Sequence, residues 1–181
     1  MLDPGCVGAR VTVVGGLAAG WGVLGVVAVL TQALVRLGPR AREALTMELG
    51  AVEWIVLVGW VAFMAHAEGW RGFHLRFSPR VVARAATLVN QPPLLHAILA
   101  PVYCMAWFHA TRRAMIVAWC VLAGILGLIS VVSMLPQPWR GIVDAGVVVG
   151  LGIGMISILW HAARAMLGTP APVSPELPPP A

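Results

Sequence analysis

The chain has 181 residues, of which 60% are hydrophobic and only 10% are charged, and its net charge is +5. A soluble domain carries roughly 25% charged residues, so this composition excludes a soluble globular protein and indicates a lipid-embedded one. All twelve basic residues are arginines spread along the sequence, which favours contact with lipid headgroups over nucleic-acid binding.

The first part of the sequence contains two predicted transmembrane helices. Residues 11–35 form an apolar run that is too long for a signal peptide and lacks a basic start. Small residues recur in it at three- and four-residue steps, which predicts a helix-packing stripe containing Gly15 and Gly22. After a basic turn, residues 50–67 form the second predicted span, and we expect Glu53 to lie shallow within it.

Residues 68–91 are the longest polar interruption of the apolar sequence. Aromatic and basic side chains alternate in its first part, as they do at membrane interfaces, so we expect contact with anionic headgroups or a partner. A Ser-Pro pair then opens a two-faced helical pattern that two later prolines stop, which predicts an amphipathic interfacial helix at 78–91. The predicted contact residues are Trp70, Arg71, Phe73, His74, Arg76, Arg80 and Arg84.

Three more spans are predicted in the second half of the chain, at residues 94–110, 114–135 and 142–167. The first of these contains a proline that should kink it. In the last one, Gly146, Gly150 and Gly154 recur every four residues and form the strongest helix-packing signal in the sequence. Residues 168–181 are rich in proline, which predicts a disordered or extended tail.

These elements predict an all-α membrane protein with five transmembrane helices and one interfacial helix, in a single domain that covers residues 1–167. Five spans place the two termini on opposite sides of the membrane. The arginines are equally divided between the two sides, and the basic turn after the first span favours an N-terminus outside the cytoplasm.

The histidines are the candidate cofactor ligands. The predicted topology places His66 and His96 near one membrane face and His109 and His161 near the other. Two such pairs could ligate two b-type haems, because neutral imidazole is a usual ligand of haem iron. The step from His96 to His109 turns their side chains about 140° apart on a helix, so each would need a different partner helix. The alternative is that these histidines form ordinary hydrogen bonds near helix ends.

Motifs of known catalytic sites are absent from the sequence. It contains no Gly-x-Ser-x-Gly, His-Glu-x-x-His, Walker-type loop or dinucleotide-binding fingerprint, so we do not expect an enzyme. Cys6, Cys104 and Cys120 are widely spaced and predict neither a disulfide nor a metal site. Glu53 is the one charge predicted inside the membrane, which gives a transporter little support.

The sequence resembles a group of small uncharacterised bacterial integral membrane proteins. The segments that carry this resemblance are residues 68–85 (EGWRGFHLRFSPRVVARA), 109–113 (HATRR) and 136–144 (PQPWRGIVD). The resemblance implies a multi-pass membrane fold and transfers no catalytic residues. The absence of lysine in an Ala-, Gly- and Pro-rich sequence also indicates a bacterial source, so we expect a bacterial inner-membrane protein.

The function predicted from these patterns is that of a non-enzymatic accessory, assembly or scaffold subunit without a cofactor. It would act through helix packing and its basic segment, against a membrane-protein partner or a second copy. One alternative is a small b-type cytochrome with bis-His ligation of haem b. The other alternative is a transporter of lipids or small solutes.

Overall fold

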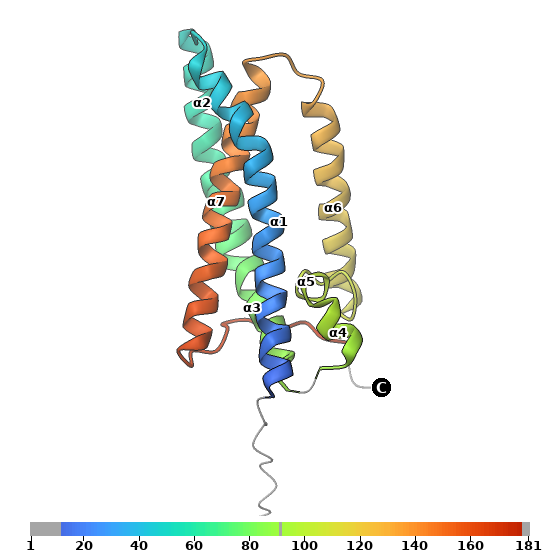
Figure 1. Ribbon diagram of the computed structural model, residues 1–181. Helices are drawn as coiled ribbons and strands as arrows, with labels where there is room; N and C mark the ends of the chain where they lie inside the picture. The colour runs from blue at the N-terminus through green and yellow to red at the C-terminus, as the bar shows by residue number, and fades with distance from the viewer. Residues whose placement is uncertain (1–11, 91, 179–181) are drawn as a thin grey trace, which may run out of the picture.

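The computed structural model describes residues 12–90 and 92–178, and all regular secondary structure in these residues is helical. Four helices are long and apolar enough to cross a membrane, which fits a multi-pass membrane protein. They are α1 (Val13–Thr46), a continuous helix formed by α2 (Ala51–Met64), η1 (Ala65–Phe77) and α3 (Ser78–Thr87), then α6 (Arg112–Val132) and α7 (Trp139–Met166). Two short helices, α4 (Leu94–Ile98) and α5 (Ala100–Cys104), connect α3 to α6 (Figure 1).

The four long helices run alternately in opposite directions, so α1 begins and α7 ends at the same end of the bundle (Figure 1). We call this the terminal end, and α4 and α5 also lie there. The opposite, or turn, end carries the connections from α1 to α2 and from α6 to α7. The prediction of ends on opposite sides is therefore not confirmed, because residues 12–90 and 92–178 contain an even number of long helices.

The fifth predicted span, residues 94–110, is not one continuous helix. Leu99, with φ −90° and ψ 24°, separates α4 from α5, and each of these helices has five residues. Pro101 lies in the first turn of α5, where its missing N–H does no harm, whereas inside one long helix it would remove a hydrogen bond. Beyond α5, Ala106 and His109 adopt left-handed conformations, with φ 60° and 49°. The segment thus turns back at the terminal end, and the five-span count is not confirmed.

The predicted interfacial helix is also different in the structure. Residues 78–87 are helical, but α3 continues directly from η1, and Ser78 has helical dihedral angles and no capping role. The polar interruption contains no proline before Pro79, which lies where the π-helical segment η1 gives way to the α-helical segment α3, and the helix continues through it. The apolar side of α3, including Val81 and Ala85, is buried in the core. This helix therefore lies within the bundle.

The core gathers small and branched side chains from α1, α3, α5 and α7. Its buried members include Ala18 and Val26 of α1 and Ile158 of α7. The predicted stripe of α1 lies against this core, since a Cβ at Gly15 would overlap the Val89 carbonyl group. A Cβ at Gly22 would lie 2.8 Å from Cys104 Sγ, so glycine allows these helices to approach closely.

The described part of the tail, residues 168–178, is extended and crosses the terminal end (Figure 1). The amide of Thr111 donates a hydrogen bond of 2.8 Å to the carbonyl oxygen of Glu176, and Leu177 packs against the core. Arg80 forms an ion pair of 3.5 Å with the Glu176 carboxylate. In the described residues this segment is thus extended and contacts the bundle through both its backbone and its side chains.

Candidate functional site

The candidate site lies along the seam between the second long helix and α7, which we call the glycine seam. It consists of Gly146, Gly150 and Gly154 of α7, all three buried, and the side chains that occupy the space a larger residue would need. Those side chains are Trp60 and Met64 opposite the first glycine, Glu68 opposite the second and Phe73 opposite the third. The glycines predicted from the sequence therefore face polar and aromatic groups of the second helix.

Glu68 places a carboxylate in the middle of the glycine seam. Its Oε2 atom would lie 2.7 Å from a Cβ built on Gly150, so it rests directly on the α7 backbone. That oxygen is buried and has no hydrogen-bond partner among the described residues. A carboxylate oxygen in such surroundings is costly in its ionised form, because no hydrogen-bond donor or cation among the described residues compensates the charge.

Three polar groups continue the glycine seam towards the terminal end. His74 Nδ1 and Ser157 Oγ share a hydrogen bond of 2.9 Å. His161, one turn further along α7, donates from Nε2 to the carbonyl oxygen of His74 at 3.3 Å, and the two imidazole rings are 5.2 Å apart. The ring of Trp70 stacks on His74 at 4.5 Å. Both histidines are thus held by specific contacts inside the bundle.

Arg84 joins four parts of the chain at the terminal end. Its side chain is 1% exposed, and its guanidinium group lies 4.3 Å from the centre of the Tyr103 ring. Nε donates to the carbonyl oxygen of Tyr103 at 2.6 Å, and Nη1 donates to that of Pro175 at 2.9 Å. Nη2 donates to the carbonyl oxygens of Phe108 and His109, at 3.2 and 2.9 Å. A planar, permanently charged donor suits this task, because its N–H groups point in several fixed directions.

A second pair of histidines lies beside Arg84. The rings of His96 and His109 are 4.5 Å apart, and the ring of Tyr103 lies 5.1 Å from that of His96. Desolvation lowers the pKa of His96, and the positive charges of His109 and Arg84 lower it further. The imidazole of His96 therefore favours its neutral form. His109 itself is exposed and carries one of the left-handed backbone conformations.

The predicted haem ligand pairs are not the pairs that the structure forms. His96 lies against His109 and His161 lies against His74, whereas His66 is exposed on η1. A haem held by two histidines would lie between their rings, and rings in direct contact leave no room for it. The predicted pairs, His66 with His96 and His109 with His161, are therefore not in contact in this structure, and bis-His ligation of haem b stays a prediction.

The predicted lipid or partner contacts divide into two groups in the structure. Trp70, Arg71, Arg76 and Arg80 are exposed, as a segment that contacts headgroups or a partner requires. The inward-facing members are Phe73, His74 and Arg84, whose contacts are described above. Their partners lie far away in the sequence, so the alternation of aromatic and basic residues gave no sign of the division.

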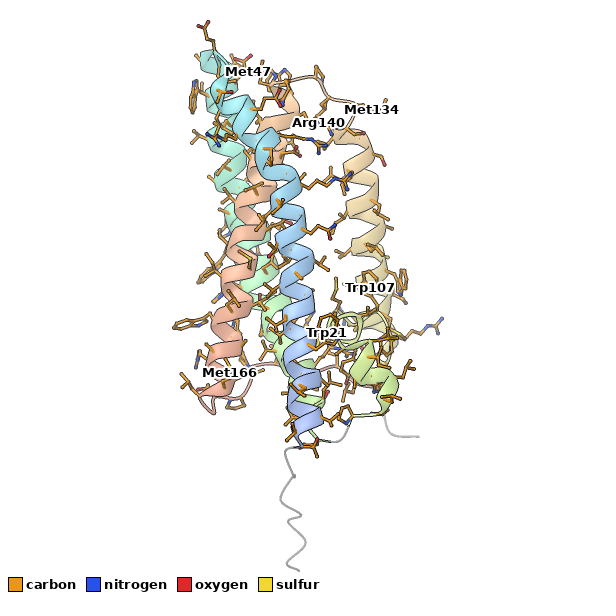
Figure 2. All side chains as sticks on the ribbon, viewed as in Figure 1. Trp21, Met47, Trp107, Met134, Arg140 and Met166 are labelled. Carbon is orange, nitrogen blue, oxygen red and sulfur yellow. The ribbon has the colours of Figure 1, made fainter. Side chains whose placement is uncertain are left out.

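Helix α6 is separated from the rest of the bundle. Figure 1 shows it standing apart from α1, and almost none of its apolar stretch is buried by the described chain. A Cβ at Gly124 or Gly127 would meet no described atom within 4 Å. Cys120, on the same helix, is exposed. At the turn end, Arg140 holds the last turn of α6 by donating to the Ser133 carbonyl oxygen at 3.4 Å (Figure 2).

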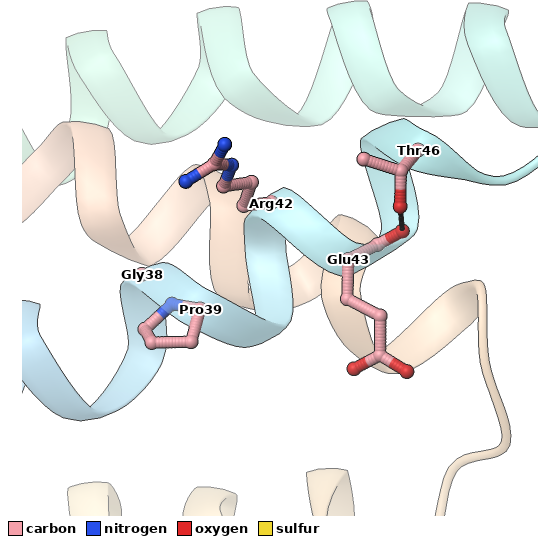
Figure 3. Close-up of a pocket in the computed structure, with 5 residues that line it drawn as sticks. All are labelled: Gly38, Pro39, Arg42, Glu43 and Thr46. Atoms are coloured by element: carbon pink, nitrogen blue, oxygen red, sulfur yellow. Dashed lines mark hydrogen bonds between the residues drawn. The ribbon is translucent and has the colours of Figure 1, made fainter.

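A shallow hollow of about 510 Å³ lies on α1 at the turn end, where Pro39 interrupts the helical hydrogen bonds (Figure 3). Arg42 and Glu43 line it, but Figure 3 shows their side chains pointing in different directions. The Thr46 hydroxyl donates to the Glu43 carbonyl oxygen at 2.7 Å. The hollow is wide open and its polar groups do not converge, which argues against a binding site for a small molecule.

Comparisons with protein-family models, curated proteins and solved structures gave no match for this chain. The resemblance noted in the sequence therefore stays a prediction. The sequence prediction places this polar segment at the membrane interface and therefore misses Glu68, whose Oε2 atom is buried between η1 and α7. The signal that could have placed it in a helix is the absence of proline between residues 40 and 78.

Proposed function

We propose that this chain is a non-enzymatic accessory or assembly subunit of a bacterial inner membrane, and that α6 binds a transmembrane helix of another membrane protein. The observation that carries the proposal is the isolation of α6, whose apolar surface is covered by almost no part of its own chain. Lipid tails alone cover an ordinary apolar helix equally well, so isolation by itself does not require a partner.

The open glycines of α6 supply the reason for a helix partner. Without a hydrophobic driving force in lipid, helices associate where small residues let their backbones approach closely. Gly15 and Gly22 of α1 and the glycine seam of α7 are already occupied by neighbours within the chain. Gly124 and Gly127 form a comparable close-approach surface that the chain itself leaves free among the described residues.

The exposed Cys120 allows a direct test of this proposal. The photoreactive amino acid p-benzoylphenylalanine, incorporated in place of Cys120, should crosslink on illumination in native membranes to the protein that covers α6. We expect Gly127→Leu to abolish the product, and Gly59→Leu to leave it intact because Gly59 also faces open space but lies on α2.

The mass of the product separates the outcomes. A product with another membrane protein that Gly127→Leu removes supports the proposal, whereas a product at twice the mass of the chain identifies a second copy as the partner. Labelling of lipid alone, unchanged by the glycine substitution, would show that α6 has no protein partner.

A further inference from the structure

Glu68 lies deep within the membrane-spanning part of the bundle. Its carboxylate rests on Gly150, which is eleven residues after the first residue of α7 and sixteen before the last. At 1.5 Å per residue, these steps correspond to about 16 Å and 24 Å along the helix. A hydrocarbon core about 30 Å thick therefore contains Glu68 unless α7 protrudes very unequally from the bilayer.

The surroundings of Glu68 contain no group that neutralises its charge. The single ion pair among the described residues joins Arg80 to Glu176, far from this position in the bundle. The helices that contact η1 carry other ionisable side chains, namely Glu53 of α2, Arg80 and Arg84 of α3, and Arg140, Asp144, His161 and Arg164 of α7. Helix η1 itself adds His66, Arg71, His74 and Arg76. Of these, none lies within 4.0 Å of the Glu68 carboxylate as an ion-pair partner.

Its position in η1 is a second unusual feature. Residues 65–77 form a π-helix of thirteen residues, whereas most π-helical segments are single turns inside α-helices and are frequently found at functional sites. Within this segment, Gly69 packs against Ile153 of α7 and brings the two backbones close together. Glu68 is thus held against α7 by its own backbone and cannot reach the membrane surface as a side chain near a helix end would.

From this geometry we infer that Glu68 is a proton-binding site inside the membrane, neutral while η1 and α7 are packed together. Binding takes up one proton and converts the carboxylate into a carboxylic acid, which removes the charge that the seam cannot compensate. Separation of η1 from α7 would admit water and release the proton. This inference does not depend on whether α6 binds a partner. It also supports the transporter alternative, since proton pathways in transporters use acidic groups inside the membrane and the sequence did not reveal Glu68 as one.

Carbodiimide labelling tests the inference on the complete protein in its native membrane. Dicyclohexylcarbodiimide is apolar and reacts with protonated carboxyl groups, whereas a water-soluble carbodiimide with a glycine ester reaches exposed ones. At about pH 7 an exposed glutamate is ionised, because its ordinary pKa is about 4.3. We expect the apolar reagent to modify Glu68 at this pH, and peptide mass spectrometry will distinguish it from Asp144, the other carboxylate with a buried oxygen lacking a partner.

Two glutamates at the turn end provide the matched control. Glu43 and Glu48 are exposed and should show the opposite preference, for the water-soluble reagent. Glu68→Gln should remove the label at this position. The unfolding temperature of this variant should lie within about 2 °C of the wild-type value, because glutamine has nearly the shape of the protonated acid and carries no charge. A difference of about 2 °C corresponds to less than about 1 kcal/mol in the free energy of unfolding for a chain of this size.

The inference is overturned if Glu68 resists the apolar reagent at neutral pH, or if the water-soluble reagent modifies it as rapidly as Glu43. Infrared spectroscopy of the wild type provides a measurement that needs no variant. A buried carboxylic acid gives a carbonyl band that shifts in deuterium oxide, and its absence at neutral pH would show that the group is ionised.

Discussion

Replacing Arg84 tests whether one buried guanidinium holds the terminal end together. Its four hydrogen bonds reach α5, the turn after it and the tail, none of which is adjacent to α3 in the sequence. Arg84→Ala leaves four carbonyl oxygens without this donor and removes the contact with the Tyr103 ring. Hydrogen bonds to charged groups contribute about 1.5–3 kcal/mol each, but the broken set is not additive, and loss of one partner from a buried charged cluster costs about 3–5 kcal/mol.

That free energy corresponds to a fall of roughly 10 °C in the unfolding temperature of a chain of this size. Thermal unfolding in detergent measures the fall, and limited proteolysis should show faster cleavage within residues 168–178, since Arg84 binds the Pro175 carbonyl oxygen. Arg84→Lys should lose about half as much stability, because an ammonium group keeps the charge but cannot reproduce the planar fork.

Arg80→Ala is the matched control, since it removes an arginine one turn earlier on the same helix. The Arg80–Glu176 pair is exposed, with 44% and 36% of the two side chains accessible, and exposed pairs contribute about 0–1 kcal/mol. If Arg84→Ala unfolds at the temperature of Arg80→Ala and its tail is cleaved no faster, the role assigned to Arg84 is wrong.

Three further measurements test separate parts of the structure. The lowered pKa of His96 predicts that this residue contributes its full stability above the ordinary pKa of about 6.5, and that the contribution is lost as the pH falls through the lowered pKa. The unfolding temperature of His96→Phe should therefore depend less on pH in that range than the unfolding temperature of the wild type. Equal pH dependence of the two proteins would contradict this prediction. Burial raises the pKa of Cys104 to about 12, so maleimide should modify Cys104 only after unfolding, as mass spectrometry will show. Modification of Cys104 in the folded protein would refute this prediction. Gly22→Leu should lower the free energy of unfolding by about 2 kcal/mol or more, because the new side chain overlaps Cys104. Gly20→Leu, whose side chain meets open space, should change it by less than about 0.5 kcal/mol. Thermal unfolding compares the two variants, and equal effects would disprove the close contact at Gly22.

The length of the apolar stretches predicted the helices correctly where a stretch is apolar from end to end. Residues 114–135 and 142–167 are continuous apolar stretches without an internal proline, and α6 and α7 occupy almost the same positions. The glycine periods of the first and last spans also indicated the surfaces on which other groups rest. In these stretches lipid and neighbouring helices favour the same apolar residues, so composition is a reliable guide.

Prediction failed where a polar side chain finds its partner far away in the sequence. The sequence predicts that His74 and Arg84 contact headgroups or a partner at the membrane interface. In the structure His74 bonds to Ser157, and Arg84 bonds to carbonyl oxygens that surround it. Residues 94–110 have the composition of a span, but Leu99 and the left-handed Ala106 turn the backbone. These outcomes depend on tertiary contacts, which hydropathy along the chain does not contain.

The contact between Arg84 and Pro175 has a consequence for the biosynthesis of the protein. Arg84 is synthesised 91 residues before Pro175, whose carbonyl oxygen it binds, and Thr111 is likewise synthesised before its partner Glu176. During translation the guanidinium therefore lacks one of its four acceptors until residue 175 has been added, and the contacts of the terminal end remain incomplete until then. A chain truncated before residue 175 would insert its helices and still leave that end open, a defect that membrane quality-control proteases could recognise.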